Sequence, residues 1–145
     1  MVPNLKLYVG PMFSGKSTKL LEQVDRYKFA KKSIVCFKPK MDNRYTQEGF
    51  IVTHSGSHVP CVLISKGQEI LDFFEGKELP DAIAIDEAFM IDDIANTCLN
   101  FFYNKRIDVL VSTLDLSSSL SSFEEVCTLL GHATKIKKCK AVCTV

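Results

Sequence analysis

Apolar runs of strand length alternate with longer stretches of helical pattern along the chain. Runs such as 82–85 and 109–111 are apolar at every position, which is typical of strands in a parallel sheet covered on both faces. The pattern predicts strands at 5–9, 33–37, 59–64, 82–85, 108–114 and 133–138, and helices at 16–30, 66–74, 92–103 and 123–130. We therefore predict an α/β fold, a three-layer sandwich with a mostly parallel sheet between helices.

Two stretches depart from this alternation. Residues 39–58 are rich in polar residues and glycine, and so long a connection inside a compact domain is either a functional loop or a mobile one. Residues 116–122 are dense in serine and could form a flexible flap or a linker. We find no internal repeat and no composition change that marks a boundary, so we expect residues 1–145 to form one domain.

The composition is that of a globular protein, with 46% hydrophobic and 24% charged residues among 145. A formal net charge of +1 gives no general attraction to nucleic acid or to an anionic membrane, so any polyanion must be held by a local site. No apolar run approaches the roughly 18 residues of a membrane span, and no leader pattern opens the chain. We expect a cytoplasmic protein that binds neither membrane nor nucleic acid, with its six scattered cysteines reduced.

The segment that begins at Gly10 reads GPMFSGKS and matches the P-loop pattern G-x-x-x-x-G-K-[ST]. It lies between an apolar strand and an amphipathic helix, where backbone N–H groups and the helix dipole can surround a di- or triphosphate. We expect Lys16 to reach the β- and γ-phosphates and the Ser17 hydroxyl to bind Mg²⁺. The alternative is a Gly/Ser turn that carries a lysine by chance. Together with the predicted sheet, the motif indicates a P-loop NTPase-like fold.

Two carboxylates follow the apolar run 82–85 directly. A magnesium-linked phosphate site usually needs a carboxylate from a second strand end, and Asp86 is our candidate for this partner of Mg²⁺. Glu87, one residue further on, would face the mouth of the phosphate site, where it could accept a proton from an attacking hydroxyl or water. The alternative is that both carboxylates cap the next segment.

Three segments occur in the order and spacing of thymidine kinases of the cellular and viral type. They read GPMFSGKSTKLL, DNRYTQEGFIVTH and AIAIDEAF. The chain resembles this family from Leu5 to its last residue. The resemblance implies transfer of the ATP γ-phosphate to the 5′-hydroxyl of thymidine or deoxyuridine, in an enzyme that is typically a tetramer.

The same resemblance assigns roles to individual residues. It implies that Glu87 is the base on the 5′-hydroxyl and that Arg44 stabilises the charge of the transferred phosphoryl group. The residues expected to hold the triphosphate are Gly10, Pro11, Met12, Phe13, Ser14, Gly15, Lys16, Ser17 and Thr18. The residues expected near the nucleoside are Met12, Asp42, Arg44, Leu114 and Phe123. Taken alone, the segment 42–44 could equally be a solvated turn, and Met12 could equally fill a gap in the core.

The chain departs from the family pattern in three places. Ala88 stands where the family has a glutamine after the Asp-Glu pair. Ser118 and Leu120 stand where an aromatic and a basic residue are usual, and a lost stacking ring weakens the grip on a base by on the order of 1 kcal/mol. The family continues into a zinc-binding lobe with a lasso loop over the nucleoside. Here the sequence ends at Val145, so we expect that lobe to be absent or truncated.

We expect no zinc in this chain. A structural zinc needs four ligands, and Cys139 with Cys143 offers two at an unusual spacing. His54 and His58 are four residues apart, but the Ser-Gly-Ser segment between them disfavours the helix that would place them on one face.

Three functions remain open from the sequence. The first is an ATP-dependent deoxynucleoside kinase of the thymidine kinase type. The second is a nucleotide-binding module derived from such a kinase, and the third is a P-loop ATPase in which Glu87 activates water. We adopt the first because the residues expected to transfer the phosphoryl group are present, whereas the departures concern the grip on the nucleoside.

Overall fold

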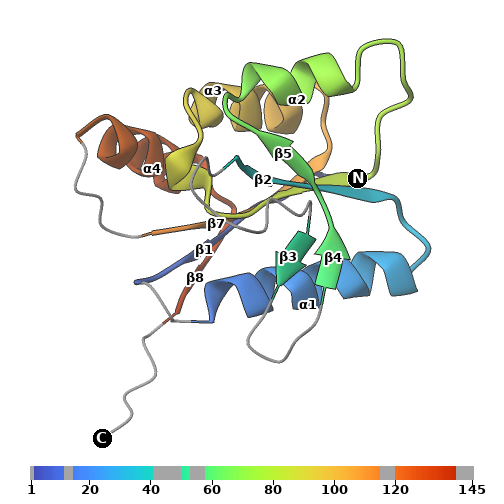
Figure 1. The fold of residues 1–145 in the computed structure, drawn as a ribbon, viewed down its shortest axis with the longest axis horizontal. Helices are drawn as coiled ribbons and strands as arrows, with labels where there is room; N and C mark the ends of the chain where they lie inside the picture. The colour runs from blue at the N-terminus through green and yellow to red at the C-terminus, as the bar shows by residue number, and fades with distance from the viewer. Residues whose placement is uncertain (1, 12–14, 41–49, 53–57, 115–119, 140–145) are drawn as a thin grey trace, which may run out of the picture.

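The computed structural model describes residues 2–11, 15–40, 50–52, 58–114 and 120–139, of which 50–52, 58 and 120–123 are described by their backbone alone. A six-stranded sheet forms the middle layer, and every strand pair in it is parallel (Figure 1). In spatial order its strands are β5 (Val62–Ile64), β2 (Ile34–Pro39), β6 (Ala82–Ile85), β7 (Asp108–Thr113), β1 (Leu5–Val9) and β8 (Lys135–Lys138). The predicted α/β fold with a parallel sheet is confirmed.

Helices cover both faces of this sheet (Figure 1). One face carries α1 (Lys16–Phe29) and a separate antiparallel pair of strands, β3 (Phe50–Val52) and β4 (His58–Pro60). The opposite face carries α2 (Gln68–Phe73), the 3-10 turn η1 (Ala88–Met90), α3 (Ile94–Leu99), the π-helical turn η2 (Asn100–Asn104) and α4 (Leu120–His132). The molecule is therefore the predicted three-layer sandwich.

Alternation along the strands divides the core into two clusters. In β6, Ala84 packs in the cluster under α1, whereas Ile83 and Ile85 pack in the larger cluster on the opposite face. All four residues of β6 are fully buried, which explains why the run reads as apolar at every position. Burial of an aliphatic side chain of this size contributes about 1.5–3 kcal/mol, so the two clusters hold the layers together.

Some elements differ from the sequence prediction. Residues 59–64 form two strands instead of one, because β4 pairs with β3 while β5 joins the main sheet beside β2. The strand β3 lies within the polar stretch 39–58, where its three residues gave no periodic signal. The helix predicted at 92–103 is shorter and ends in the π-helical turn η2. The helix α4 begins at Leu120, inside the serine-dense stretch.

Candidate functional site

The carboxyl ends of β1, β7 and β6 lie side by side at one edge of the sheet. The strand β7 pairs in parallel with both others, with Val9 opposite Thr113 and Ile85 opposite Val111. In open parallel sheets, ligands bind beyond this edge. The strand order thus brings together the P-loop after β1, the Asp-Glu pair after β6 and two hydroxyl residues that end β7.

The first part of the P-loop is fixed to the neighbouring strand, because the Gly10 N–H donates to the Thr113 carbonyl at 3.3 Å. At the other end, Gly15 has φ +80° and precedes α1 as its N-terminal cap. A Cβ on Gly15 would meet no atom within 4 Å, so the conformation and not the space requires glycine here. Residues 12–14, which include Met12, Phe13 and Ser14, lie outside the described residues.

The lysine and the hydroxyl of the motif open α1. Lys16 is 7% exposed, and its Nζ donates to the Pro11 carbonyl at 3.4 Å, so the ammonium group is folded back over the loop. Ser17 Oγ donates to Asp86 Oδ1 at 2.9 Å. Thr18 follows on the first turn and is half-buried. The bond between Ser17 and Asp86 joins the end of the P-loop to the second strand end, and the role of both residues at Mg²⁺ stays a prediction.

Asp86 is a buried carboxylate, and burial raises its pKa. Four groups act in the opposite direction: the Ser17 hydroxyl first, then the Ser112 hydroxyl, the Lys16 charge and the Glu87 backbone N–H. The Asp86 N–H continues the ladder to β2 by donating to the Phe37 carbonyl at 2.9 Å. The backbone at Asp86 is thus bonded to β2, and its carboxyl group lies near the Ser17 hydroxyl and the Lys16 charge.

Glu87 has a left-handed backbone conformation, with φ 51° and ψ 45°. A residue with a Cβ pays on the order of 1 kcal/mol for this conformation, and such outliers gather at functional sites. The turn ends β6 abruptly and starts η1, whose Met90 N–H donates to the Glu87 carbonyl at 3.1 Å. Glu87 therefore stands at the carboxyl edge of the sheet, half-buried, one residue beyond Asp86.

Two hydroxyl residues that the sequence reading missed end the strand between β1 and β6. Ser112 and Thr113 are fully buried, and neither hydroxyl oxygen has a hydrogen-bond partner among the described residues. Ser112 is nevertheless close enough to lower the pKa of Asp86. In the sequence they appear only as two hydroxyl residues at the end of an apolar run. Their position beside the site depends on the strand order, which the sequence does not predict.

The residues expected at the nucleoside are described only in part. Leu114 follows β7 directly and is half-buried. Asp42 and Arg44 lie outside the described residues, and for Phe123 the backbone of α4 is described without its side chain. Their roles stay predictions.

The donor set of the site fits Mg²⁺, which prefers oxygen ligands such as the Ser17 hydroxyl and the Asp86 carboxylate. Within the described residues, no three His, Cys, Asp or Glu side chains gather in a way that could hold a metal ion by themselves. The described cysteines, Cys36, Cys61, Cys98, Cys127 and Cys139, are free thiols, while Cys143 and His54 lie outside the described part. No described helix is long and apolar enough to cross a membrane.

A solved structure of similar fold is the RuvB Holliday junction branch migration motor of Thermotoga maritima. The likeness has a TM-score of 0.52 at 15% sequence identity, and it covers 94% of this chain and 38% of that one. At this identity the likeness shows the fold alone, a P-loop NTPase-like arrangement.

Closer relatives are found by sequence. The chain is 32% identical over its full length to a thymidine kinase of Pseudothermotoga lettingae, of which it spans 77%. It is 30% identical over 97% of its length to the thymidine kinases of Aster yellows witches'-broom phytoplasma and Onion yellows phytoplasma, of which it spans 66%. The family model for thymidine kinase matches residues 3–145. The chain therefore belongs to the thymidine kinase family, a family of phosphotransferases.

Proposed function

We propose that this chain carries the phosphoryl-transfer half of a thymidine kinase. It transfers the γ-phosphoryl group of ATP to the 5′-hydroxyl of thymidine or deoxyuridine, with Glu87 as the base. The observation that carries the proposal is the 2.9 Å hydrogen bond from Ser17 to Asp86. It joins the end of the P-loop to a buried carboxylate at the place where a nucleotide-bound Mg²⁺ is held in P-loop enzymes.

The chain's own residues divide the work as follows. Ser17 and Asp86 would hold Mg²⁺, which when bound neutralises charge on the β- and γ-phosphates. Lys16 turns from the Pro11 carbonyl, its present partner at 3.4 Å, to the phosphate oxygens. A buried ammonium group is worth more there than in water because the surrounding dielectric is low.

Glu87 supplies the acid–base chemistry. As the 5′-oxygen attacks the γ-phosphorus in line, a new P–O bond forms, the bond to the β-phosphate oxygen breaks and ADP leaves. The hydroxyl proton passes to the Glu87 carboxylate, and Arg44 stabilises the charge of the moving phosphoryl group. The left-handed turn at Glu87 supports this role, because it fixes the base at the sheet edge where the phosphates would lie.

The direct test uses the purified chain with Mg-ATP labelled at the γ-phosphate, with and without thymidine. Labelled thymidine monophosphate is the expected product. Free phosphate formed equally in both reactions would make the protein a P-loop ATPase. Bound ATP without any labelled product would make it a nucleotide-binding module.

The base is tested by Glu87→Gln, with the exposed Glu78→Gln as a matched control. Glutamine keeps the size of the side chain but cannot take a proton, so transfer should fall about 10²- to 10⁴-fold while ATP binding stays unchanged. A Glu87→Gln protein that transfers phosphate at the normal rate would remove Glu87 from the mechanism.

Further properties follow from the family and belong to the same proposal. We infer that the protein supplies a precursor for DNA synthesis, that it is cytoplasmic and that it forms a homotetramer. We infer further that it binds a nucleoside and neither nucleic acid nor membrane. We also infer that this chain itself holds no zinc. Sedimentation and metal analysis of the purified protein test the tetramer and the zinc.

A further inference from the structure

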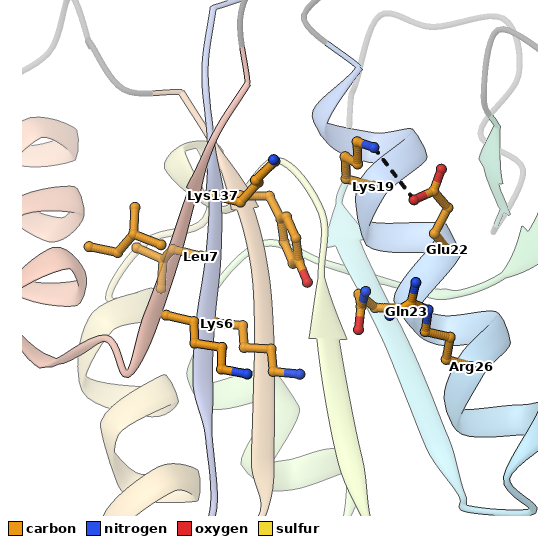
Figure 2. A pocket seen from close by; sticks show the side chains of 10 residues that line it. Lys6, Leu7, Lys19, Glu22, Gln23, Arg26 and Lys137 are labelled. Carbon is orange, nitrogen blue, oxygen red and sulfur yellow. Dashed lines mark ion pairs between the residues drawn. The ribbon is translucent and has the colours of Figure 1, made fainter.

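A groove runs between α1 and the edge of the sheet formed by β1 and β8. It encloses about 550 Å³. Figure 2 shows Lys6 and Lys137 reaching from the strands toward α1, and Gln23 and Arg26 standing on the helix across from them. We call this space the basic groove. Its described lining residues are Lys6, Leu7, Tyr8, Lys19, Glu22, Gln23, Arg26, Lys135, Ile136 and Lys137.

The strand register explains why cations gather there. Lys6 pairs with Lys135 and Tyr8 pairs with Lys137, so these four side chains share one face of the sheet. Tyr8 belongs to the core cluster under α1, which identifies the face as the α1 side. Lys138 pairs with Val9 and alternates to the opposite face. Because side chains alternate along a strand, Lys135 and Lys137 of β8 both point toward the helix.

Positive charge in the groove is poorly compensated. Five of the described lining residues are cations and one, Glu22, is an acid. Glu22 contacts Lys19 at 3.7 Å with both side chains about half exposed, a pair that offers little stabilisation. Asp108 lies near Lys6, but its oxygens already accept hydrogen bonds from the Asn4 N–H and from the Tyr27 hydroxyl.

Lys6 shows the consequence of this crowding. Burial lowers its pKa, the neighbouring charge of Lys135 lowers it further, and Arg26 adds a smaller effect in the same direction. Asp108 opposes these effects in part. The fold thus holds like charges together at a cost that an anion in the groove would offset.

The spread of the cations indicates the size of that anion. Lys19 and Arg26 are seven residues apart on α1, which corresponds to roughly 10 Å along the helix axis. A chain of two or three phosphates spans this length more readily than a single phosphate group. A volume of about 550 Å³ lies in the range of small-molecule sites and is too small for a duplex.

We propose that the basic groove is a second anion site, separate from the P-loop, and that it binds a small oligophosphate such as the phosphate chain of a nucleotide. None of its described lining residues comes from the P-loop or from the Asp-Glu pair. The proposal goes beyond phosphoryl transfer, and it holds whether or not the chain phosphorylates thymidine.

The test measures binding of inorganic tripolyphosphate by calorimetry, without Mg²⁺ and at low salt. The full chain carries Lys16→Ala to weaken the P-loop site. One-to-one binding should remain in this variant. Adding Lys135→Gln should weaken it roughly tenfold or more, the size expected for one charge-assisted hydrogen bond. Adding Lys138→Gln, a lysine of the same strand that faces the other way, should change it less than about twofold.

Three outcomes would overturn the proposal. Lys16→Ala alone could abolish all binding, which would place the anion in the P-loop. Lys135→Gln and Lys138→Gln could weaken binding equally, which would indicate attraction by surface charge. A chain that binds no tripolyphosphate but changes its oligomeric state with Lys135→Gln would assign the groove to an interface between copies.

A second arm identifies the source of the phosphates. The same titration with ATP in the Lys16→Ala chain shows whether a base and sugar add affinity. Tighter binding of ATP than of tripolyphosphate, lost together with Lys135→Gln, supports a nucleotide as the ligand. Equal binding supports recognition of the phosphate chain alone. Circular dichroism of each variant shows that it remains folded.

Discussion

The two strands that flank β1 are opposites. In β7, five of six residues are buried, and the strand lies inside the sheet between β1 and β6. In β8, all four residues are exposed, three of them are lysine, and the strand forms the sheet edge. Both pair with β1 in parallel, so the difference comes from what covers them.

The difference shows where polar groups cost free energy and where they do not. In β7 a buried hydroxyl without a partner costs on the order of 1–3 kcal/mol, and Ser112 and Thr113 have none by geometry among the described residues, so they call for a functional reason. In β8 lysines are hydrated, and charge on an edge strand also prevents pairing with another sheet. The site proposed for phosphoryl transfer lies at the end of β7, whereas the open cationic surface lies along β8.

The largest expected effect is a difference in ATP turnover between variants of two lysines on α1. Lys16→Ala, at the end of the P-loop, should lower ATP turnover by about 10²-fold or more, because the variant loses a buried cation expected to contact the phosphates. Lys19→Ala, one turn later in the basic groove, should change turnover less than about twofold. Steady-state kinetics at saturating thymidine compare them. Equal losses in both variants would contradict the separation of the two regions.

The sequence sufficed for the parts of the site that depend on local pattern. The run 82–85, the P-loop and the amphipathic helix after it are each contained in one short segment, so period and motif determine them. The sequence also placed Ser17 and Asp86 together at one expected magnesium site, and the hydrogen bond between them is consistent with it, because the carboxyl ends of parallel strands share an edge.

The remaining features depend on contacts between distant segments. That β7 lies between β1 and β6 is a matter of strand order, so the burial of Ser112 beside Asp86 could not be predicted. The strand β3 is defined by its pairing with β4 and has no pattern of its own. Glu87 adopts its left-handed conformation just after β6 ends, and this could not be predicted because the position is not a glycine.

A second prediction sharpens the meaning of the buried hydroxyls. Ser112→Ala removes a buried hydroxyl that has no hydrogen-bond partner by geometry among the described residues but favours the charged form of Asp86, so the free energy of unfolding should change by less than about 1 kcal/mol. Asp86 then loses a dipole that favours its charged form, so affinity for Mg-ATP should fall several-fold. Denaturant titration and nucleotide binding measure the two effects.

Thr113→Val is the control for this variant. By alternation its side chain lies on the face of Val111, away from Asp86, so valine should stabilise the fold without changing affinity for Mg-ATP. A loss of nucleotide affinity in both variants would mean that any change at the end of β7 disturbs the site.

A third prediction concerns the helical layer over β7. Glu125 of α4 accepts a hydrogen bond from the Ala95 N–H at the start of α3. Burial raises its pKa, and Asp93 and Asp92 raise it further against the effect of that bond. A raised pKa means that the stability associated with this group is full below its unfolded pKa and declines as pH rises through its folded pKa.

Glu125→Gln keeps an acceptor for Ala95 and removes the charge. The variant should match the parent in acid and exceed it at pH 7 by about 0.5 kcal/mol, a small value because the side chain is partly exposed. Unfolding measured from pH 4 to pH 8 follows the difference. A variant that is less stable than the parent at pH 7 would show that the charged acceptor outweighs the burial.

The smallest expected effect returns to β8. Lys135→Gln removes the neighbouring charge that lowers the pKa of Lys6 most, so the free energy of unfolding should rise by a few tenths of a kcal/mol at low salt. Because ions screen exposed charges beyond about 3 Å at 1 M salt, the gain should vanish there. Lys138→Gln, on the other face, should give no gain. A gain in the free energy of unfolding that persists in 1 M salt would come from packing and not from charge repulsion. Side-chain packing would then matter in β8 as it does in β7, against the contrast drawn between the two strands.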